Sequence, residues 1–224
     1  MPTVVASAQG PRGSLRLTLR DDDALELRVN GVFVMDTLET SSEEALADAS
    51  LAAAESVGSV LIGGLGLGYT LRSVLADPRV EHVVAVEIEG PLIEWLRTGV
   101  VPHGPGLVDD ERVRVVHGDV AQVVAGSADS AYDVVLLDTD NGPGNLVHAS
   151  NQRLYQPGFL SDVHRVLSPG GTVTVWSSHR SLDLGKALGE VFENTGEIEC
   201  PVVLQKRRET YWLYTGTRAA QYQP

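Results

Sequence analysis

The sequence is poor in cysteine, in basic residues and in long apolar runs, and each shortage excludes a class of protein. Its single cysteine, Cys200, rules out an intrachain disulfide and any metal cluster built on cysteine. The histidines lack the spacing of metal ligands, so we expect no metal site. No run of about 18 apolar residues occurs, which argues against a transmembrane helix. The first residues do not have the pattern of a signal peptide, and the chain is expected to be soluble and cytoplasmic.

Basic residues are outnumbered, with 17 lysines and arginines against 30 acidic residues and a net charge of −13. A nucleic-acid partner requires a basic face, and basic clusters such as Lys206–Arg208 are short. We therefore expect no nucleic acid and no membrane as a partner, and an acidic surface favours a cationic ligand. With 224 residues, 43% of them hydrophobic, the chain can form one full domain and a small appendage.

The first 40 residues have the pattern of a small antiparallel sheet. Apolar residues alternate from residue 14 to residue 37, and Asn30–Gly31 is a strong hairpin signal between two such runs. These features predict a three-stranded meander. Ser41 and Glu44 then form a capping-box pattern, which predicts a helix through the alanine-rich run as far as Ser56.

From residue 59 on, predicted strands alternate with predicted helices. The strands are expected at residues 60–62, 82–88, 112–117, 132–137 and 172–176, followed by a hairpin of 197–204 and 209–214. Such alternation is typical of a parallel sheet with helices on both faces. The predicted fold class is α/β, a doubly wound, mostly parallel seven-stranded sheet with an antiparallel C-terminal strand, preceded by the meander. We expect a meander at 1–40, the main domain at 41–217 and a tail at 218–224.

Four glycines lie in the turn after the first of these strands. Gly63, Gly64, Gly66 and Gly68 let the backbone turn sharply and approach a ligand at the start of a helix, whose N-terminal end is positive. The spacing G-x-G-x-G, rather than the G-x-G-x-x-G of dinucleotide sites, favours an S-adenosyl cofactor. Tight packing is the alternative explanation for these glycines.

Carboxylates stand at the ends of three predicted strands, where open α/β sheets bind their ligands. Glu87 can accept hydrogen bonds from two ribose hydroxyls. Asp119 can accept from an adenine amino group while Gly118 leaves room for the base, although Asp119 could instead cap the next helix. Asp138 follows an apolar run and precedes a glycine-proline loop, so mere surface charge explains it poorly.

The segment after Asp138 is the predicted substrate side of the site. We expect Asp138 and Asp140 to be catalytic, and Asn141, His148 and Tyr155 to contact the substrate.

These motifs occur together in the order and spacing of the spermidine synthase family of polyamine aminopropyltransferases, which the chain resembles over nearly its whole length. The matching segments are 61–68, 86–89, Gly118–Asp119, 132–138 and 154–171. The resemblance implies the Rossmann-like fold of class I S-adenosylmethionine-dependent methyltransferases, with an N-terminal β-domain. It also implies that Glu87 holds the ribose, that Asp119 holds the adenine and that Asp138 takes a proton from the attacking amine.

Departures from the family pattern guide the choice of reaction. Polyamine-making members carry an aspartate in the glycine loop, where this chain has Leu65 and Leu67. The family's second loop acid is displaced to Asp140 or replaced by Asn141, and the N-terminal glutamine and tyrosine of the amine pocket have no clear counterpart between residues 31 and 42.

We therefore expect a transferase that moves a methyl group from S-adenosylmethionine to an amine or another small nucleophile. Two alternatives stay open. One is a true polyamine aminopropyltransferase that uses decarboxylated S-adenosylmethionine, and the other is a non-catalytic member that only binds the cofactor. The edge of the meander is a candidate surface for pairing into a homodimer.

Overall fold

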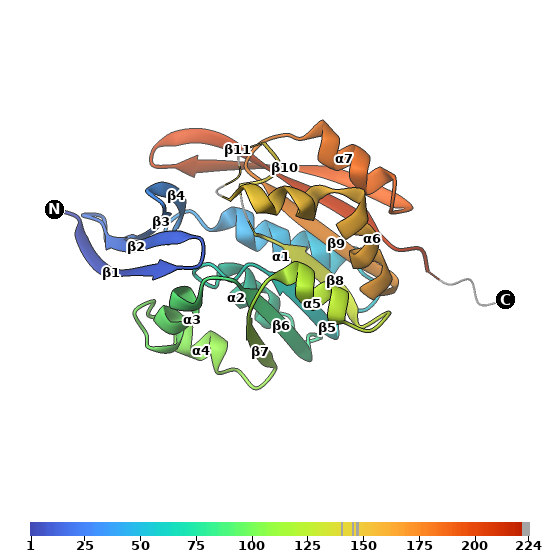
Figure 1. The fold of residues 1–224 in the computed structure, drawn as a ribbon, viewed down its shortest axis with the longest axis horizontal. Coiled ribbons are helices and arrows are strands. Elements are labelled where there is room, and N and C mark those ends of the chain that lie inside the picture. Colours follow the sequence, from blue (N-terminus) through green and yellow to red (C-terminus); the bar gives the residue numbers. More distant parts are fainter. Residues whose placement is uncertain (140, 145, 147, 221–224) are drawn as a thin grey trace.

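The chain forms a small antiparallel sheet and a large mixed sheet, with helix α1 (Ser41–Ala53) following the small sheet in the chain (Figure 1). The structure is a computed structural model that describes residues 1–139, 141–144, 146 and 148–220. Among these residues, no helix is long and apolar enough to span a membrane.

The small sheet has four antiparallel strands in the order β1 (Thr3–Gly10), β2 (Gly13–Leu19), β3 (Leu25–Val29) and β4 (Val32–Asp36). The prediction of three strands is wrong, because it missed β1. This strand lies at the edge of the sheet and most of its side chains are exposed, so its sequence carries little of the alternation that marks a half-buried strand. The predicted turn at Asn30–Gly31 is confirmed, and both residues have the positive φ that such hairpin turns require.

The large sheet has seven strands in the order β10-β11-β9-β8-β5-β6-β7. The bounds are β5 (Ser59–Gly63), β6 (His82–Glu87), β7 (Val113–His117), β8 (Tyr132–Leu137), β9 (Leu167–Ser177), β10 (Asn194–Leu204) and β11 (Arg207–Thr217). The pairs β5–β6, β6–β7, β5–β8 and β8–β9 are parallel. Strand β11 pairs antiparallel with β9 and with β10. The predicted fold class is therefore confirmed.

Helices cover both faces of the large sheet. They are α2 (Tyr69–Ala76), α3 (Gly90–Arg97), α4 (Gly104–Val108), α5 (Val120–Gly126), α6 (Pro157–Val166) and α7 (Leu182–Gly189), with a 3₁₀ turn at Ala149–Tyr155. One hydrophobic core contains residues of helices α1, α2, α3 and α4, of the small sheet and of the large sheet, such as Ile62. The other core contains residues of helices α5, α6 and α7 and of the opposite face of the large sheet, such as Leu61. Adjacent strand residues thus enter opposite cores, as the pleat of a strand requires.

Both boundaries of helix α1 differ from the prediction. Helix α1 begins at Ser41 and ends at Ala53, and the hydroxyl of Thr40, not that of Ser41, reaches Glu44 at 3.1 Å. The predicted capping box at Ser41 is therefore wrong. At the other end of the chain, Arg218 donates its backbone N–H to Gly171 at 2.9 Å, so the predicted tail is held at its first residue.

The hairpin of β10 and β11 extends from the large sheet toward the small one (Figure 1). The backbone N–H of Val203 donates to Glu39 at 3.0 Å, and the side-chain amide of Gln205 donates to Glu26 at 3.0 Å. The meander is therefore fixed against the main domain by contacts that lie far apart in sequence.

Candidate active site

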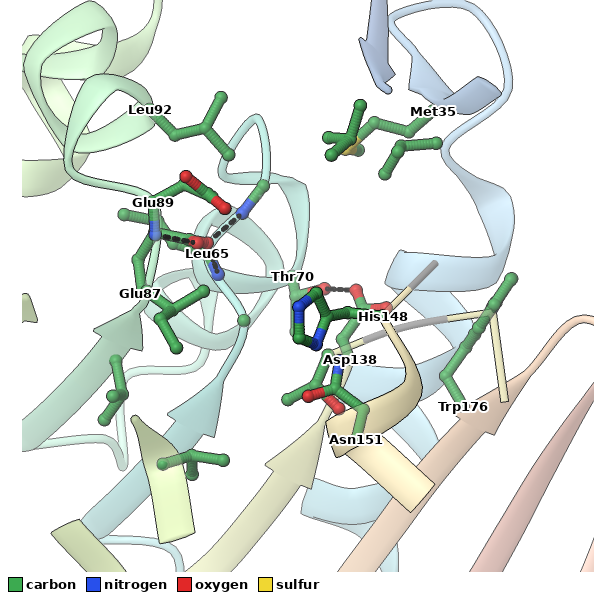
Figure 2. A pocket seen from close by; sticks show the side chains of 18 of the residues that line it. Met35, Leu65, Thr70, Glu87, Glu89, Leu92, Asp138, His148, Asn151 and Trp176 are labelled. Atoms are coloured by element: carbon green, nitrogen blue, oxygen red, sulfur yellow. Dashed lines mark hydrogen bonds between the residues drawn. The ribbon is translucent and has the colours of Figure 1, made fainter. Parts of the chain in front are cut away.

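A pocket lies at the carboxyl ends of the parallel strands, beside the point where the strand order reverses between β5 and β8 (Figure 2). Its walls come from the small sheet, the start of α1, the glycine loop, the ends of β6 to β9 and the segment around His148. The described lining residues contain one guanidinium, that of Arg12, and five carboxylates, those of Glu43, Glu87, Glu89, Asp119 and Asp138. The pocket is therefore strongly acidic.

Two of the four predicted loop glycines line the pocket. A side chain at Gly64, whose φ is +93°, would place its Cβ 1.9 Å from the carbonyl oxygen of Asp138. Gly66 has a φ of +51°, and a Cβ there would lie 2.9 Å from the sulfur of Met35. Only glycine adopts such backbone angles readily, so the loop can follow the pocket wall closely only with glycine at these positions.

The other two loop glycines pack closely against neighbouring helices, and their contact with a cofactor stays a prediction. A Cβ on Gly63 would lie 2.8 Å from Val120 of α5, and one on Gly68 would lie 3.0 Å from Leu107 of α4. Neither glycine is among the residues that line the pocket.

Glu87, at the end of β6, is 6% exposed and holds the glycine loop in place. One carboxylate oxygen accepts from the backbone N–H groups of Leu65 at 2.9 Å and Gly66 at 3.2 Å, and the other accepts from that of Glu89 at 2.9 Å (Figure 2). A carboxylate offers about four acceptor positions, so these bonds leave room for about one further donor. No pattern in the sequence indicated this structural role.

Glu89 lies on the same wall, under the turn between β1 and β2. A Cβ on Gly10 would fall 1.7 Å from a carboxylate oxygen of Glu89, so the turn packs directly on this side chain. Burial, together with the negative charge of Glu87, raises the pKa of Glu89.

Asp119 combines the two roles that were considered for it. Its carboxylate caps α5 by accepting from the backbone N–H of Ala121 at 2.9 Å, and it also lines the pocket beside Gly118. It forms an ion pair with Arg153 and lies 3.8 Å from the guanidinium of Arg12. Contact with an adenine stays a prediction.

Arg12, which sequence reasoning missed, reaches into the pocket from the turn of the small sheet. Its guanidinium donates to the side-chain oxygen of Asn151 at 2.6 Å. The turn therefore connects the meander to the segment that follows β8, and it covers the end of the pocket that holds Asp119.

Asp138 stands directly after β8, and one of its carboxylate oxygens accepts from the hydroxyl of Thr70 at 3.1 Å (Figure 2). The side chain keeps an opening to the pocket, but protein atoms surround it closely. This burial raises the pKa of Asp138 to about 6, with a further contribution from the charge of Glu87 and an opposing one from the Thr70 bond. A carboxylate with such a pKa is suited to accept a proton near neutral pH.

The predicted substrate residues do not all lie at this pocket. Asn141 and His148 line it, and Nδ1 of His148 lies 2.8 Å from the hydroxyl of Ser150. Tyr155 does not line it, because its side chain is 3% exposed within the core formed by α5 to α7. Asp140 lies outside the described residues, so its catalytic role stays a prediction. In the described part of the chain, no group of three or more His, Cys, Asp or Glu side chains could hold a metal ion.

The sequence pattern of the spermine/spermidine synthase domain matches residues 39–197 of this chain. The chain belongs to the spermine/spermidine synthase family. It is 34% identical over 159 residues to a polyamine aminopropyltransferase of Aeropyrum pernix, a match that covers 65% of this chain and 48% of that protein. It is 33% identical over 141 residues to polyamine aminopropyltransferase 2 of Pseudomonas aeruginosa, covering 61% of this chain and 38% of that protein. The matches thus span about half or less of these relatives.

Solved structures show the same fold. A spermidine synthase in complex with the transition-state analogue AdoDATO superposes with a TM-score of 0.84 over 98% of this chain and 75% of that chain, at 19% identity. The spermidine synthase of Thermotoga maritima superposes with a TM-score of 0.81 over 98% of this chain and 73% of that chain, also at 19% identity.

The expectation of methyl transfer is wrong. The family match is to a spermine/spermidine synthase domain, and the curated relatives named above are polyamine aminopropyltransferases. That expectation relied on the missing acid in the glycine loop. The structure shows that the pocket draws its carboxylates from α1 and from the ends of β6, β7 and β8, so the loop alone is a poor guide to its charge.

Proposed function

We propose that the protein transfers an aminopropyl group from decarboxylated S-adenosylmethionine to a small amine. The observation that carries the proposal is the excess of carboxylates in the pocket of a chain that belongs to the spermine/spermidine synthase family. The donor and a protonated amine are both cationic, and an acidic cleft attracts cations. The donor also lacks the carboxylate of intact S-adenosylmethionine, which the negative charge of this pocket disfavours.

The described residues fit such a donor. Gly64 and Gly66 permit close approach of the backbone, and Glu87 retains an acceptor position for a ribose hydroxyl. At Gly118 the nearest atom to an added Cβ is 3.9 Å away, so the surface there is open to a flat ring beside Asp119. In this proposal the nucleoside lies between the ends of β5, β6 and β7.

The bound donor supplies a carbon on a positively charged sulfur, to which the amine nitrogen bonds as the carbon–sulfur bond breaks and the sulfur becomes a neutral thioether. Asp138 accepts the proton that the nitrogen loses. With a pKa of about 6 it is mostly ionised at pH 7 to 8, yet basic enough to share a proton as the new bond forms. The hydroxyl of Thr70 fixes its orientation.

Release of 5′-methylthioadenosine from decarboxylated S-adenosylmethionine tests this proposal. We would follow the release by chromatography with and without a panel of amines such as putrescine, cadaverine and spermidine. Amine-dependent release supports aminopropyl transfer. Tight binding of the donor with no release for any amine would contradict it and favour a protein that only binds the cofactor.

A further inference from the structure

Helix α1 carries a carboxylate on its buried face. Glu43 shares this face with Leu46, Ala47 and Ser50, all of which are buried, and its own side chain is only 8% exposed. It lines the same pocket as Asp138. Burial of an ionisable side chain is costly unless a partner compensates its charge, so the position calls for a partner.

The described residues do not supply a positive partner for this carboxylate. The hydroxyl of Ser42 donates to Glu43 at 2.6 Å, but no ion pair among the described residues includes Glu43 or Asp138. Burial, with a smaller contribution from the negative charge of Asp138, raises the pKa of Glu43 to about 7. Two carboxylates therefore share one end of the pocket without a cation between them.

An aromatic wall borders the same end. The rings of Trp176 and Tyr211 meet edge to face with centroids 4.8 Å apart. Burial of Tyr211, with a smaller contribution from the charge of Glu43, raises the pKa of Tyr211 to about 12. Trp176 is 8% exposed and lines the pocket (Figure 2). Its indole N–H is buried and lacks a hydrogen-bond partner among the described residues, so the wall at this end of the pocket contains a donor that the described residues leave unpaired.

We propose that Glu43, together with Asp138, binds an alkylammonium group at this end of the pocket, with Trp176 covering the methylene chain. Carboxylates match the charge of an ammonium group, and an aromatic ring accommodates both methylenes and a cation. The proposal rests on the proposed function and deepens it, because it names a residue that selects the charged group. The negative charge beside Asp138 comes from Glu43 of α1.

The ammonium group can belong to the aminopropyl arm of the donor or to the acceptor amine, and binding measurements separate these sources. Decarboxylated S-adenosylmethionine carries the group, whereas 5′-methylthioadenosine lacks it. We would titrate both into wild-type protein, Glu43→Gln and the matched control Glu44→Gln by calorimetry. Glu44 is adjacent on α1, but its side chain is 46% exposed and pairs with Arg72 at 3.1 Å.

If the group belongs to the donor, Glu43→Gln weakens binding of decarboxylated S-adenosylmethionine on the order of tenfold or more and leaves 5′-methylthioadenosine binding unchanged. If it belongs to the acceptor, donor binding is unchanged and the KM for putrescine rises on the order of tenfold, with a smaller change in kcat. Glu44→Gln matches the wild type in both assays. Unchanged donor affinity together with an unchanged KM in Glu43→Gln would overturn the proposal.

Two further comparisons keep the result interpretable. Normal binding of 5′-methylthioadenosine by Glu43→Gln shows that the variant is folded, and Glu43→Asp should recover part of the lost affinity. If Glu43 acted only by changing the ionisation of Asp138, Glu43→Gln would have no effect in an Asp138→Asn background, and this outcome would also overturn the proposal. Absence of transfer by the wild-type protein would refute the proposed function, while the donor-binding comparison would still test Glu43.

Discussion

Replacement of Glu87 by alanine should destabilise the whole domain, because this carboxylate holds three backbone N–H groups. It accepts from Leu65 at 2.9 Å, Gly66 at 3.2 Å and Glu89 at 2.9 Å, and it is 6% exposed. A buried donor without an acceptor costs about 1 to 3 kcal/mol. Since the loop borders the pocket, water can reach part of it, and we use the lower figure for each of the three donors. The expected loss is about 3 kcal/mol of unfolding free energy.

For a domain of this size, that loss lowers Tm by about 6 to 12 °C. Thermal unfolding followed by circular dichroism measures it, and Glu94→Ala is the matched control because Glu94 is exposed on α3. The control should change Tm by no more than about 2 °C, since exposed substitutions change stability by about 0.5 kcal/mol or less. A Glu87→Ala variant as stable as the control would show that the loop amides do not depend on this carboxylate.

Three other substitutions test the site. Asp138→Asn keeps the shape of the side chain and removes the base, so kcat at saturating donor and amine should fall on the order of a hundredfold, and an unchanged kcat would contradict this. In the wild type, kcat/KM should fall as the pH drops through about 6, the pKa to which burial raises Asp138. Gly66→Val puts a β-branched residue at a φ of +51° beside Met35, so it should abolish donor binding. Circular dichroism should show that the sheet is still folded. Normal donor binding by this variant would assign the glycine to packing. Glu43 has a folded-state pKa of about 7 against an ordinary 4.5, so it contributes stability that is present below about pH 4.5 and is lost as the pH rises through 7. In urea unfolding, Glu43→Gln should therefore gain stability relative to the wild type as the pH is raised from 5 to 8. A difference in unfolding free energy that stays constant with pH would contradict the raised pKa.

The large sheet could be predicted because its strands are nearly continuous apolar runs, such as 60–62 and 132–137, separated by helical segments. Such runs are what burial on both faces of a parallel sheet requires. Strand β1 could not be predicted from alternation, since it is an edge strand with mostly exposed side chains. The start of α1 was misplaced by one residue because Thr40 and Ser41 are both residues that favour the N-cap.

Part of the candidate site followed from a rule of the fold. Residues at the carboxyl ends of parallel strands meet at one edge of the sheet, and this rule placed Glu87 and Asp138 at the pocket. Glu43 was missed because an acid in the first turn of a helix has an ordinary explanation, its favourable interaction with the helix dipole. Only the packing of α1 against the large sheet shows that this carboxylate enters the pocket.

Arg12 and Tyr155 show the same limit in opposite directions. Arg12 lies in a turn far from the glycine loop in sequence, yet the fold of the small sheet brings it to the pocket. Tyr155 lies close to the predicted substrate segment in sequence, yet its 3₁₀ turn directs it into the core. Proximity in sequence was therefore a weaker guide to the site than position at the end of a strand.

The central claim is that the protein transfers an aminopropyl group, and the mass added to an amine tests it most directly. The wild-type protein would be incubated with putrescine and an equimolar mixture of decarboxylated and intact S-adenosylmethionine, and the amine products analysed by mass spectrometry. We expect spermidine, the aminopropyl adduct of putrescine, to be the main product and to decrease strongly with Asp138→Asn. A product that carries a methyl group and no aminopropyl group would contradict it.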